Sequence, residues 1–479
     1  MANLKVLLKD TVIYGVSSIF GRFLNYLLVP LYTYTLKSCS DYGIYTDIYS
    51  QTALLLVILT FGMESTFFRF INKEDNPAKQ KRIYTTALLL VGMVALIFVL
   101  LVMAFLQPIA NIEGYGEHKW YIGMMALVVA QDAFQAIIYA NLRNEHKSIK
   151  FACLKMLFIF ISIMLNLVAY LLLPNINPDW EITVKWAFVI NLVSTTIISL
   201  IFLKDLIGVK WTFWREKAKE MLLYTWPLLV LGIAGILNQV AGQILLPRLR
   251  ERADGLTQLG IYEAGVKIAM IMALITQAFR YAYEPFVFGS SKEKDNRQMY
   301  AVAMKYFIGF TLAAFLCVIG YMDILKFIVG TSFREGLQVV PVVMAAEIMM
   351  GIVVNLSFWY KLTDKTIYGA FLSIAGCVVL FVIDIIFIPR IGYWACAWGG
   401  VAGYGTTMIL SYILGQKHYA IPYDLKSIGL YLVLASLFSA VVLNEPSSWS
   451  VFLRLALNTL LVIIFVGKLF YDIKKHKKI

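Results

Sequence analysis

Long apolar runs dominate this sequence and decide what it can fold into. Of its 479 residues, 60% are hydrophobic and 15% are charged, whereas soluble domains average about 45–50% apolar and about 25% charged residues. The apolar residues form runs of about 20, the length of an α-helix that crosses a bilayer. Barrel strands would alternate in polarity over about ten residues, and these runs are apolar on most faces. The sequence therefore predicts an all-α polytopic membrane protein.

Hydropathy predicts fourteen transmembrane helices. They are expected near residues 11–36, 43–71, 83–106, 119–142, 150–173, 185–203, 220–247, 259–288, 298–320, 339–361, 367–389, 391–415, 427–443 and 450–471. The first run continues to about Thr35 without a small-residue cleavage site, so we expect a retained helix rather than a signal peptide. The links contain no nucleotide-binding loop, metal-ligand spacing or nucleophile elbow, so we expect no cofactor, no metal and no enzymatic activity.

The positive charges predict the orientation of the chain. Lys and Arg outnumber Asp and Glu by 42 to 29, and with the amino terminus inside they concentrate in the inner links. The positive-inside rule then places both termini in the cytoplasm, and the surplus indicates a membrane protein rather than a nucleic-acid binder. The richest inner link is 204–219, whose Trp211, Phe213 and Trp214 suit a segment at the membrane surface.

One spacing pattern occurs twice and predicts an internal repeat. Pro30 ends an apolar run and Gly43 follows 13 residues later, and Pro247 and Gly260 repeat this spacing. Six helices precede the second copy, an even number, so both copies enter the membrane from the same side, as in repeats related by an axis along the membrane normal. We therefore expect pseudo-twofold lobes at 1–205 and 220–416, a cytoplasmic linker at 206–219, and two additional helices with a basic tail at 417–479.

Polar residues on two of the predicted helices point to a cavity. Charged groups at bilayer depth cost about 2.5–3.5 kcal/mol each, so they are expected to face protein or water. In the first helix Tyr14, Ser18, Arg22 and Asn25 fall within about 80° at the helical step. In the second, Asp47, Gln51, Gly62, Ser65 and Arg69 fall within about 60°. Two neighbouring helices thus each present one polar face.

Each charged residue also has a structural interpretation. Arg69 lies near a helix end, where a long side chain reaches the membrane surface. Glu263 and Lys267 are spaced to form an ion pair within one helix. Asp132, like Glu347 and Asp384, is open to pairing by neighbouring helices. Arg22 lies near mid-span on a polar face, so we favour a substrate or gating role for it.

Short motifs in the same order along the chain resemble one family of transporters. They are Tyr14-Gly15 with Gly21-Arg22, Tyr42-Gly43-Ile44-Tyr45, Leu259-Gly260-Ile261-Tyr262 and Ile388-Pro389-Arg390-Ile391-Gly392-Tyr393. They resemble the polysaccharide-exporter (Wzx-type) flippases of the multidrug/oligosaccharidyl-lipid/polysaccharide (MOP) superfamily. The resemblance implies two six-helix lobes, with helices 1, 2, 7 and 8 lining a central cavity. It also implies that an undecaprenyl-diphosphate-linked oligosaccharide is flipped to the outer leaflet for O-antigen, capsule or exopolysaccharide assembly.

The residues in that expected cavity suit a diphosphate that carries sugars, because guanidinium groups bind phosphate with two parallel hydrogen bonds. The substrate-binding candidates are Arg22, Asn25, Tyr14, Gln51, Arg69, Gln239, Gln243, Lys267 and Arg280. The coupling or gating candidates are Asp47, Glu64, Asp132 and Glu284. The implied partners are the lipid-linked oligosaccharide, the bilayer, a polysaccharide polymerase and glycosyltransferases, and the implied location is the bacterial inner membrane.

Three alternatives stay open from the sequence. A MATE-like drug/cation antiporter is kept open by the four acidic coupling candidates, although a basic cavity argues against it and such proteins usually have twelve helices. A lipid II flippase shares fourteen helices but tends to carry more arginines in helices 1, 2 and 8. A membrane-embedded glycosyltransferase or ligase would need larger outer loops than this chain has.

Overall fold

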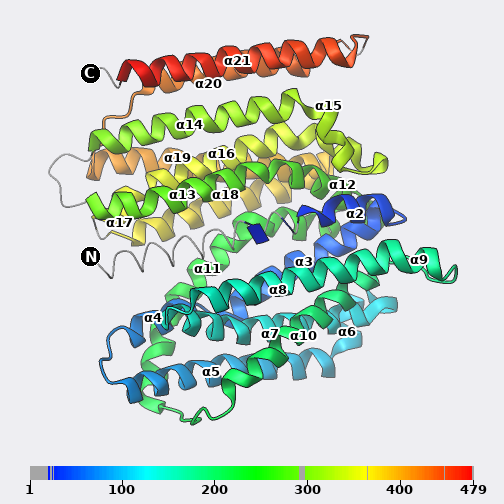
Figure 1. Ribbon diagram of the computed structural model, residues 1–479, viewed down its shortest axis with the longest axis vertical. Helices are drawn as coiled ribbons and strands as arrows, with labels where there is room; N and C mark the ends of the chain where they lie inside the picture. The colour runs from blue at the N-terminus through cyan, green and yellow to red at the C-terminus, as the bar shows by residue number, and fades with distance from the viewer. Residues whose placement is uncertain are drawn as a thin grey trace. The chain divides into compact units, whose positions relative to one another are not determined.

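The computed structural model describes residues 20, 21, 24, 26–290, 297–363, 365–446 and 448–476, without the side chains of 281–290 and 475–476. Every regular element in these residues is a helix (Figure 1). Eleven of the helices are long and apolar enough to cross a membrane, or twelve if one bent pair is counted as a single span. The helix expected over 11–36 lies only partly within the described residues, and α2 (Leu28–Thr35) is the regular element described there. The prediction of an all-α membrane protein is confirmed.

The chain divides into two compact units, Met1–Gly260 and Ile261–Ile479. The first unit contains α2, α3 (Cys39–Thr60), α4 (Met63–Ile71), α5 (Pro77–Ala104), α6 (Leu106–Ile112), η1 (Gly116–His118), α7 (Lys119–Asn144), α8 (Ser148–Leu167), η2 (Val168–Leu172), α9 (Leu173–Ile176), α10 (Lys185–Leu206), α11 (Arg215–Leu249) and the first half of α12 (Arg252–Ala269). The predicted lobes, which divide at the linker 206–219, remain a prediction.

The second unit begins within α12 and runs to the described carboxyl-terminal end. It contains α13 (Ile271–Ser290), α14 (Arg297–Gly320), α15 (Met322–Leu325), η3 (Lys326–Ile328), η4 (Thr331–Val339), α16 (Val340–Leu356), α17 (Phe358–Leu362), α18 (Ile367–Ile391), α19 (Tyr393–His418), α20 (Leu425–Leu443) and α21 (Val451–His476). Helices α20 and α21 pack on α14, and Asn458 of α21 donates a hydrogen bond to the Gly320 carbonyl at 3.0 Å. Inside a membrane bundle, where water is absent, hydrogen bonds of this kind from amide side chains join neighbouring helices.

Tyrosines hold α3 in the first unit. Tyr42 and Tyr45 stack with ring centroids 5.7 Å apart, and Tyr45 lies 5.1 Å from Tyr32 of α2. The Tyr32 hydroxyl donates to Asn166 of α8 at 2.7 Å. A tyrosine ring whose hydroxyl is hydrogen-bonded buries a large apolar area without leaving a polar group unpaired. These contacts fix the helix that carries the polar residues expected to line a cavity.

Two expected helices are broken in the structure. The run expected over 43–71 divides into α3 and α4 at Gly62, whose φ of 73° favours glycine. A Cβ on Gly62 would lie 2.7 Å from the Leu228 Cβ, so the break also allows α11 to approach closely. The run expected over 259–288 bends by 41° between α12 and α13. The sequence stays apolar through both points, so a hydropathy profile cannot predict either break.

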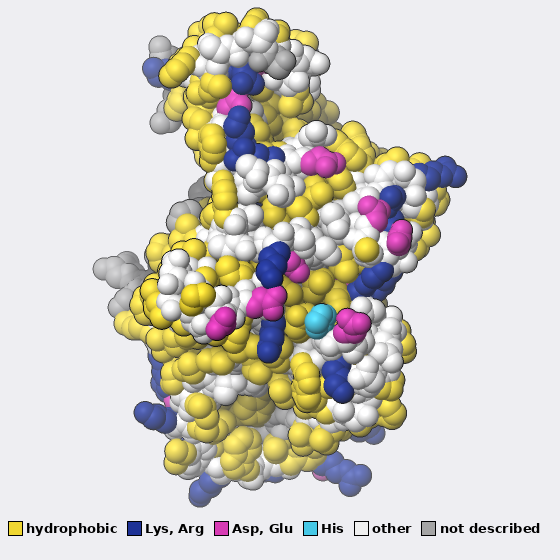
Figure 2. Space-filling model, turned by 90° about the vertical axis from the view of Figure 1, so that its right-hand side faces the viewer, with side chains coloured by type: hydrophobic (Ala, Val, Ile, Leu, Met, Phe, Trp, Pro, Cys, Tyr) yellow, Lys and Arg dark blue, Asp and Glu magenta, His cyan; other side chains and the backbone are white. Residues whose placement is uncertain are grey.

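Charged side chains lie among apolar ones on the surface in Figure 2. Several of the Lys and Arg side chains there have an Asp or Glu side chain next to them, and hydrophobic side chains cover much of the rest. Many exposed side chains on the helices are large and apolar, such as Leu100, Phe160 and Ile463. Such a surface suits a helix bundle surrounded by lipid.

Candidate transport site in the first unit

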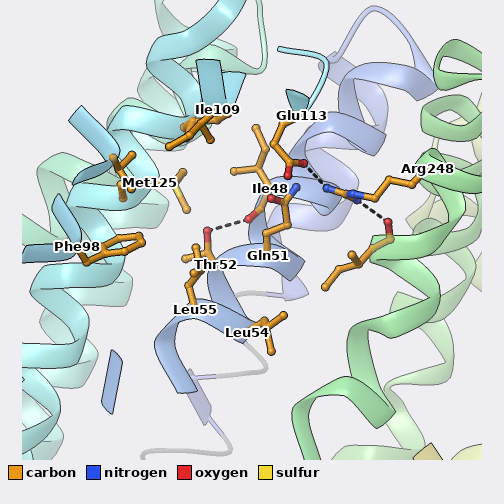
Figure 3. A pocket seen from close by; sticks show the side chains of 14 residues that line it. Ile48, Gln51, Thr52, Leu54, Leu55, Phe98, Ile109, Glu113, Met125 and Arg248 are labelled. Atoms are coloured by element: carbon orange, nitrogen blue, oxygen red, sulfur yellow. Dashed lines mark hydrogen bonds and ion pairs between the residues drawn. The ribbon is translucent and has the colours of Figure 1, made fainter. Parts of the chain in front are cut away.

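A hollow of about 410 Å³ opens beside α3, and we call it the α3 hollow (Figure 3). Gln51 and Thr52 lie in its middle, between Phe98 on one side and Arg248 on the other. Its walls come from α3, α5, α6, α7 and α11 and are mostly apolar. It is lined by Ile48, Gln51, Thr52, Leu54, Leu55, Phe98, Val102, Ile109, Glu113, Ile122, Met125, Ala126, Ile244 and Arg248. Amide, hydroxyl and guanidinium groups are suited to bind sugars and phosphates.

An ion cluster around a buried aspartate lies next to this hollow, and we call it the Asp47 cluster. It consists of Asp47, Glu113, Tyr115, Arg248 and Arg252. The Asp47 side chain is 0% exposed, and its two oxygens accept hydrogen bonds from Arg248 at 2.9 Å and from Arg252 at 3.1 Å. Arg248 also pairs with Glu113. Two carboxylates thus balance two guanidinium groups, which makes burial of the Asp47 charge tolerable.

Tyr115 completes the cluster as a hydrogen-bond donor. Its hydroxyl donates to Asp47 at 2.7 Å, and the Arg252 guanidinium lies 4.7 Å from the centroid of its ring. Burial, together with the charge of Asp47, raises the pKa of the Tyr115 phenol. The phenol therefore keeps its proton and donates to the carboxylate. The cluster joins α3 to the link before η1 and to the ends of α11 and α12.

The two glycines of the repeat pattern pack against each other. A Cβ on Gly43 would lie 1.9 Å from the carbonyl oxygen of Leu256, and one on Gly260 would lie 1.9 Å from that of Cys39. Each glycine thus faces the carbonyl four residues before the other glycine. Only glycine permits this approach of α3 and α12.

A second hollow, of about 540 Å³, lies beside the end of α4, and we call it the α4 hollow. It is lined by Arg69, Phe70, Lys73, Glu74, Ile83, Lys217, Glu220, Leu223 and Tyr224. These residues come from the end of α4 and its link to α5, from α5, and from the first turns of α11. The Arg69 guanidinium lies 4.1 Å from the centroid of the Tyr224 ring.

The predicted substrate-binding residues are distributed over several sites. Gln51 lines the α3 hollow and Arg69 the α4 hollow. Gln243 accepts a hydrogen bond from Ser50 at 2.5 Å, while Gln239 is exposed on α11. Tyr14, Arg22 and Asn25 lie outside the described residues. In the second unit Lys267 pairs with Glu263 at 2.5 Å, and Arg280 is exposed on α13.

The predicted coupling residues mostly have charged neighbours. Asp47 lies in the ion cluster, and Glu64 pairs with Arg143 of α7. Asp132 is half-buried and interacts electrostatically with Lys155. The Lys155 ammonium lies 4.0 Å from the centroid of the Tyr139 ring. The side chain of Glu284 lies outside the described ones. Among the described residues no group of three His, Cys, Asp or Glu side chains is placed to hold a metal ion.

Sequence reasoning missed Glu113, Tyr115, Arg248 and Arg252 because links or helix ends supply them. One signal was available, since the link after Pro247 carries three arginines although it is predicted to lie outside. An outer link that rich in bases departs from the positive-inside rule, so a structural or functional reason for those charges is expected.

Comparisons with known proteins give the family and the fold. Residues 7–282, more than half of the chain, match the family described as "Polysaccharide biosynthesis protein". No curated protein matches the chain.

Solved structures of transporters share the fold. The lipid II flippase MurJ in its inward closed conformation is 14% identical, with a TM-score of 0.72 over 96% of this chain and 99% of the flippase. An inward-facing multidrug resistance MATE family transporter of the MOP superfamily is 15% identical, with a TM-score of 0.63 over 85% of this chain and 94% of the transporter. The MATE multidrug transporter DinF-BH is 15% identical, with a TM-score of 0.61 over 87% and 96%. The protein therefore has the fold of MOP-superfamily transporters, and it belongs to the polysaccharide biosynthesis protein family.

Proposed function

We propose that the protein flips an undecaprenyl-diphosphate-linked oligosaccharide from the inner to the outer leaflet of the bacterial inner membrane by alternating access. The product would serve the assembly of O-antigen, capsule or exopolysaccharide. The protein would act as a transporter rather than an enzyme, with a polymerase and glycosyltransferases acting before and after it. Both termini and the linker 206–219 would lie in the cytoplasm.

The observation that carries the proposal is the family match over residues 7–282. The matched region contains the α3 hollow, the Asp47 cluster and the α4 hollow, so the polar features of the first unit lie within it. Sugar-linked diphosphates need cations and hydrogen-bonding groups inside a water-excluded bundle. Tyr14, Arg22, Asn25 and Gln51 are the residues that we propose to contact the substrate.

The Asp47 cluster and the contact between Gly43 and Gly260 would close one end of the transport path. Both join α3 to the region where α11 ends and α12 begins. In an alternating-access cycle the closed end must open in turn, so both contacts would break in the opposite state. Packed contacts with two discrete arrangements are suited to such a switch.

A lipid II flippase is the second candidate. It is favoured by the match that covers 96% of this chain and 99% of the lipid II flippase structure. At 14% identity that match supports the fold, and the family match favours the oligosaccharide substrate.

Deletion of the gene in its host tests the proposal and separates the two candidates. We expect surface polysaccharide to disappear and lipid-linked repeat units to accumulate on the inner side, both restored by the gene on a plasmid. We also expect the gene not to rescue cells depleted of their lipid II flippase. Rescue of those cells, with surface polysaccharide unchanged by the deletion, would favour the second candidate instead.

A further inference from the structure

The α4 hollow contains two cations that have no acidic partner among the described residues. Its two acids are already paired, since Glu220 lies 2.7 Å from Lys217 and Glu74 lies 3.7 Å from Lys79. Arg69 and Lys73 are exposed to the hollow and form no ion pair among the residues described. The hollow therefore offers positive charge to an anion from outside.

Aromatic rings hold the Arg69 side of this hollow in place. The Arg69 guanidinium lies 4.1 Å from the centroid of the Tyr224 ring, and the rings of Tyr224 and Phe70 meet edge to face with centroids 6.2 Å apart. A guanidinium that rests on a ring keeps its edge N–H groups free to donate. The geometry is thus fixed before any ligand arrives, which lowers the entropy cost of binding.

The hollow lies at the ends of candidate membrane spans, where lipid headgroups are expected. It is formed where α4 ends and where α5 and α11 begin. The link before α11 is attached there, because Thr85 donates to the Thr212 carbonyl at 2.8 Å and the Trp214 amide donates to Thr86 at 3.0 Å. Trp211 in this link is exposed. Exposed tryptophans beside the ends of membrane spans mark the membrane interface.

An exposed apolar stripe leads away from the hollow along α11. Leu223, which lines the hollow, is 70% exposed, and Trp226 is 66% exposed one turn further along. Val230 is also exposed, and the spacing of three and four residues places all three on one face of the helix. A cationic hollow at the interface with an apolar stripe next to it complements a molecule that has an anionic head and a hydrocarbon chain.

We propose that the α4 hollow binds the phosphate head of an anionic membrane lipid, with Arg69 and Lys73 on the phosphate and the chain along Leu223, Trp226 and Val230. The site is distinct from the α3 hollow and does not depend on which glycan the protein moves. The same head chemistry has two sources: an anionic phospholipid of the bilayer, or the polyprenyl diphosphate carrier before it enters the transport path.

Lipid binding to the purified, delipidated full chain tests the proposal. Native mass spectrometry would follow titrations with phosphatidylglycerol, undecaprenyl diphosphate, zwitterionic phosphatidylcholine and inorganic pyrophosphate. Each base near an anionic lipid surface contributes about fivefold in affinity. We therefore expect Arg69→Gln with Lys73→Gln to weaken binding of an anionic lipid by about 25-fold. Arg69→Lys, which keeps the charge, should bind within about threefold of the wild type.

The matched control is Arg297→Gln with Lys361→Gln. These bases also rest on aromatic rings, those of Tyr419 and Phe358, but lie in the second unit. This pair should leave lipid binding unchanged, and thermal unfolding would confirm that both double variants are folded. If the first double variant fails to fold, the single variants Arg69→Gln and Lys73→Gln replace it, with about a fivefold loss expected from each.

A third variant tests the role of the hydrocarbon chain. Trp226→Ala should weaken binding of both anionic lipids and leave pyrophosphate unaffected. A preference of tenfold or more for undecaprenyl diphosphate would assign the site to the carrier, and equal binding of the two anionic lipids would assign it to bulk phospholipid. The proposal is overturned by unchanged binding in the Arg69/Lys73 variant or by an equal loss in the control. The proposal would also be overturned if pyrophosphate bound as tightly as the anionic lipids and Trp226→Ala did not weaken binding of those lipids.

Discussion

At the scale of single residues, the structure changes the interpretation of Asp47. The sequence places it on a polar helix face and makes it a coupling candidate, which no observation tests. The structure gives its buried carboxylate three donors, from Tyr115, Arg248 and Arg252. Helical periodicity could predict that Asp47 avoids lipid, but it could not predict partners from residues 68 to 205 positions away in the chain.

Removal of the Asp47 charge should destabilise the first unit. Asp47→Asn removes a buried negative charge and leaves the partly exposed guanidinium groups of Arg248 and Arg252 without a full counter-charge. The expected cost lies between that of an exposed pair and the value for a fully buried pair, which is about 3–5 kcal/mol. The control is Asp254→Asn, because the pair of Asp254 with Arg250 is more exposed and such pairs contribute about 0–1 kcal/mol. Thermal unfolding in detergent measures both. Equal shifts in Tm for the two variants would contradict the account of the cluster.

Arg22 remains the strongest substrate-binding prediction from the sequence, and it lies outside the described residues. Arg22→Lys keeps the charge but loses the paired hydrogen bonds to phosphate, so partial export is expected. Arg22→Ala should abolish export, and Arg22→Glu should do the same because it repels the diphosphate. Glycan export would be measured beside membrane abundance. Normal export by Arg22→Ala at normal abundance would reject the role, and loss of export in step with loss of protein would indicate a structural one.

At the scale of elements, hydropathy predicts where most helices lie but not where they break. The run over 43–71 is apolar throughout, yet Gly62 divides it because α11 approaches at that point. Gln51 and Arg69 line different hollows, because 18 residues of helix separate them by about 27 Å along the axis even though helical periodicity places them on one face. Tertiary contacts of this kind leave no trace in a hydropathy profile.

The close approach of α3 and α12 should be sensitive to one methyl group. Gly43→Ala and Gly260→Ala each place a Cβ within 1.9 Å of a carbonyl oxygen, so the helices must separate at a cost of about 1–3 kcal/mol. Gly429→Ala in α20 is the control because no atom lies within 4 Å of its Cβ, and removal of a helical glycine stabilises by about 0.5–1 kcal/mol. Unfolding midpoints that fall equally in all three variants would argue against the close contact.

At the scale of the whole molecule, the proposed transport cycle depends on two predictions, the internal repeat and the orientation in the membrane. The twofold relation between the repeats stays a prediction from the sequence. A superposition of residues 11–205 on 220–415 should match Pro30 with Pro247 by rotation about the membrane normal. The all-α membrane class could be predicted because it depends on composition, whereas the predicted fourteen spans compare with eleven or twelve in the described residues. The ion cluster could not be predicted because it depends on how distant links fold together.

Cysteine labelling tests the orientation. On a background without the five native cysteines, Lys210→Cys should react with a membrane-impermeant reagent only after the cells are opened. Glu117→Cys, in a link predicted to lie outside, should react in intact cells. Reaction of Lys210→Cys in intact cells would overturn the cytoplasmic placement of the linker and, with it, the parallel repeat.

The central claim is that this chain itself moves a lipid-linked oligosaccharide across a bilayer. The most direct measurement uses purified protein in liposomes that carry a labelled undecaprenyl-diphosphate oligosaccharide, with a glycan-cleaving enzyme added outside. Without flipping, only the outer-leaflet half of the label is accessible, and the account predicts that the wild-type protein makes nearly all of it accessible. Arg22→Ala protein at equal density should leave the inner half protected. Protection of the inner half in wild-type liposomes, matching protein-free liposomes under an imposed ion gradient of either direction, would contradict the account.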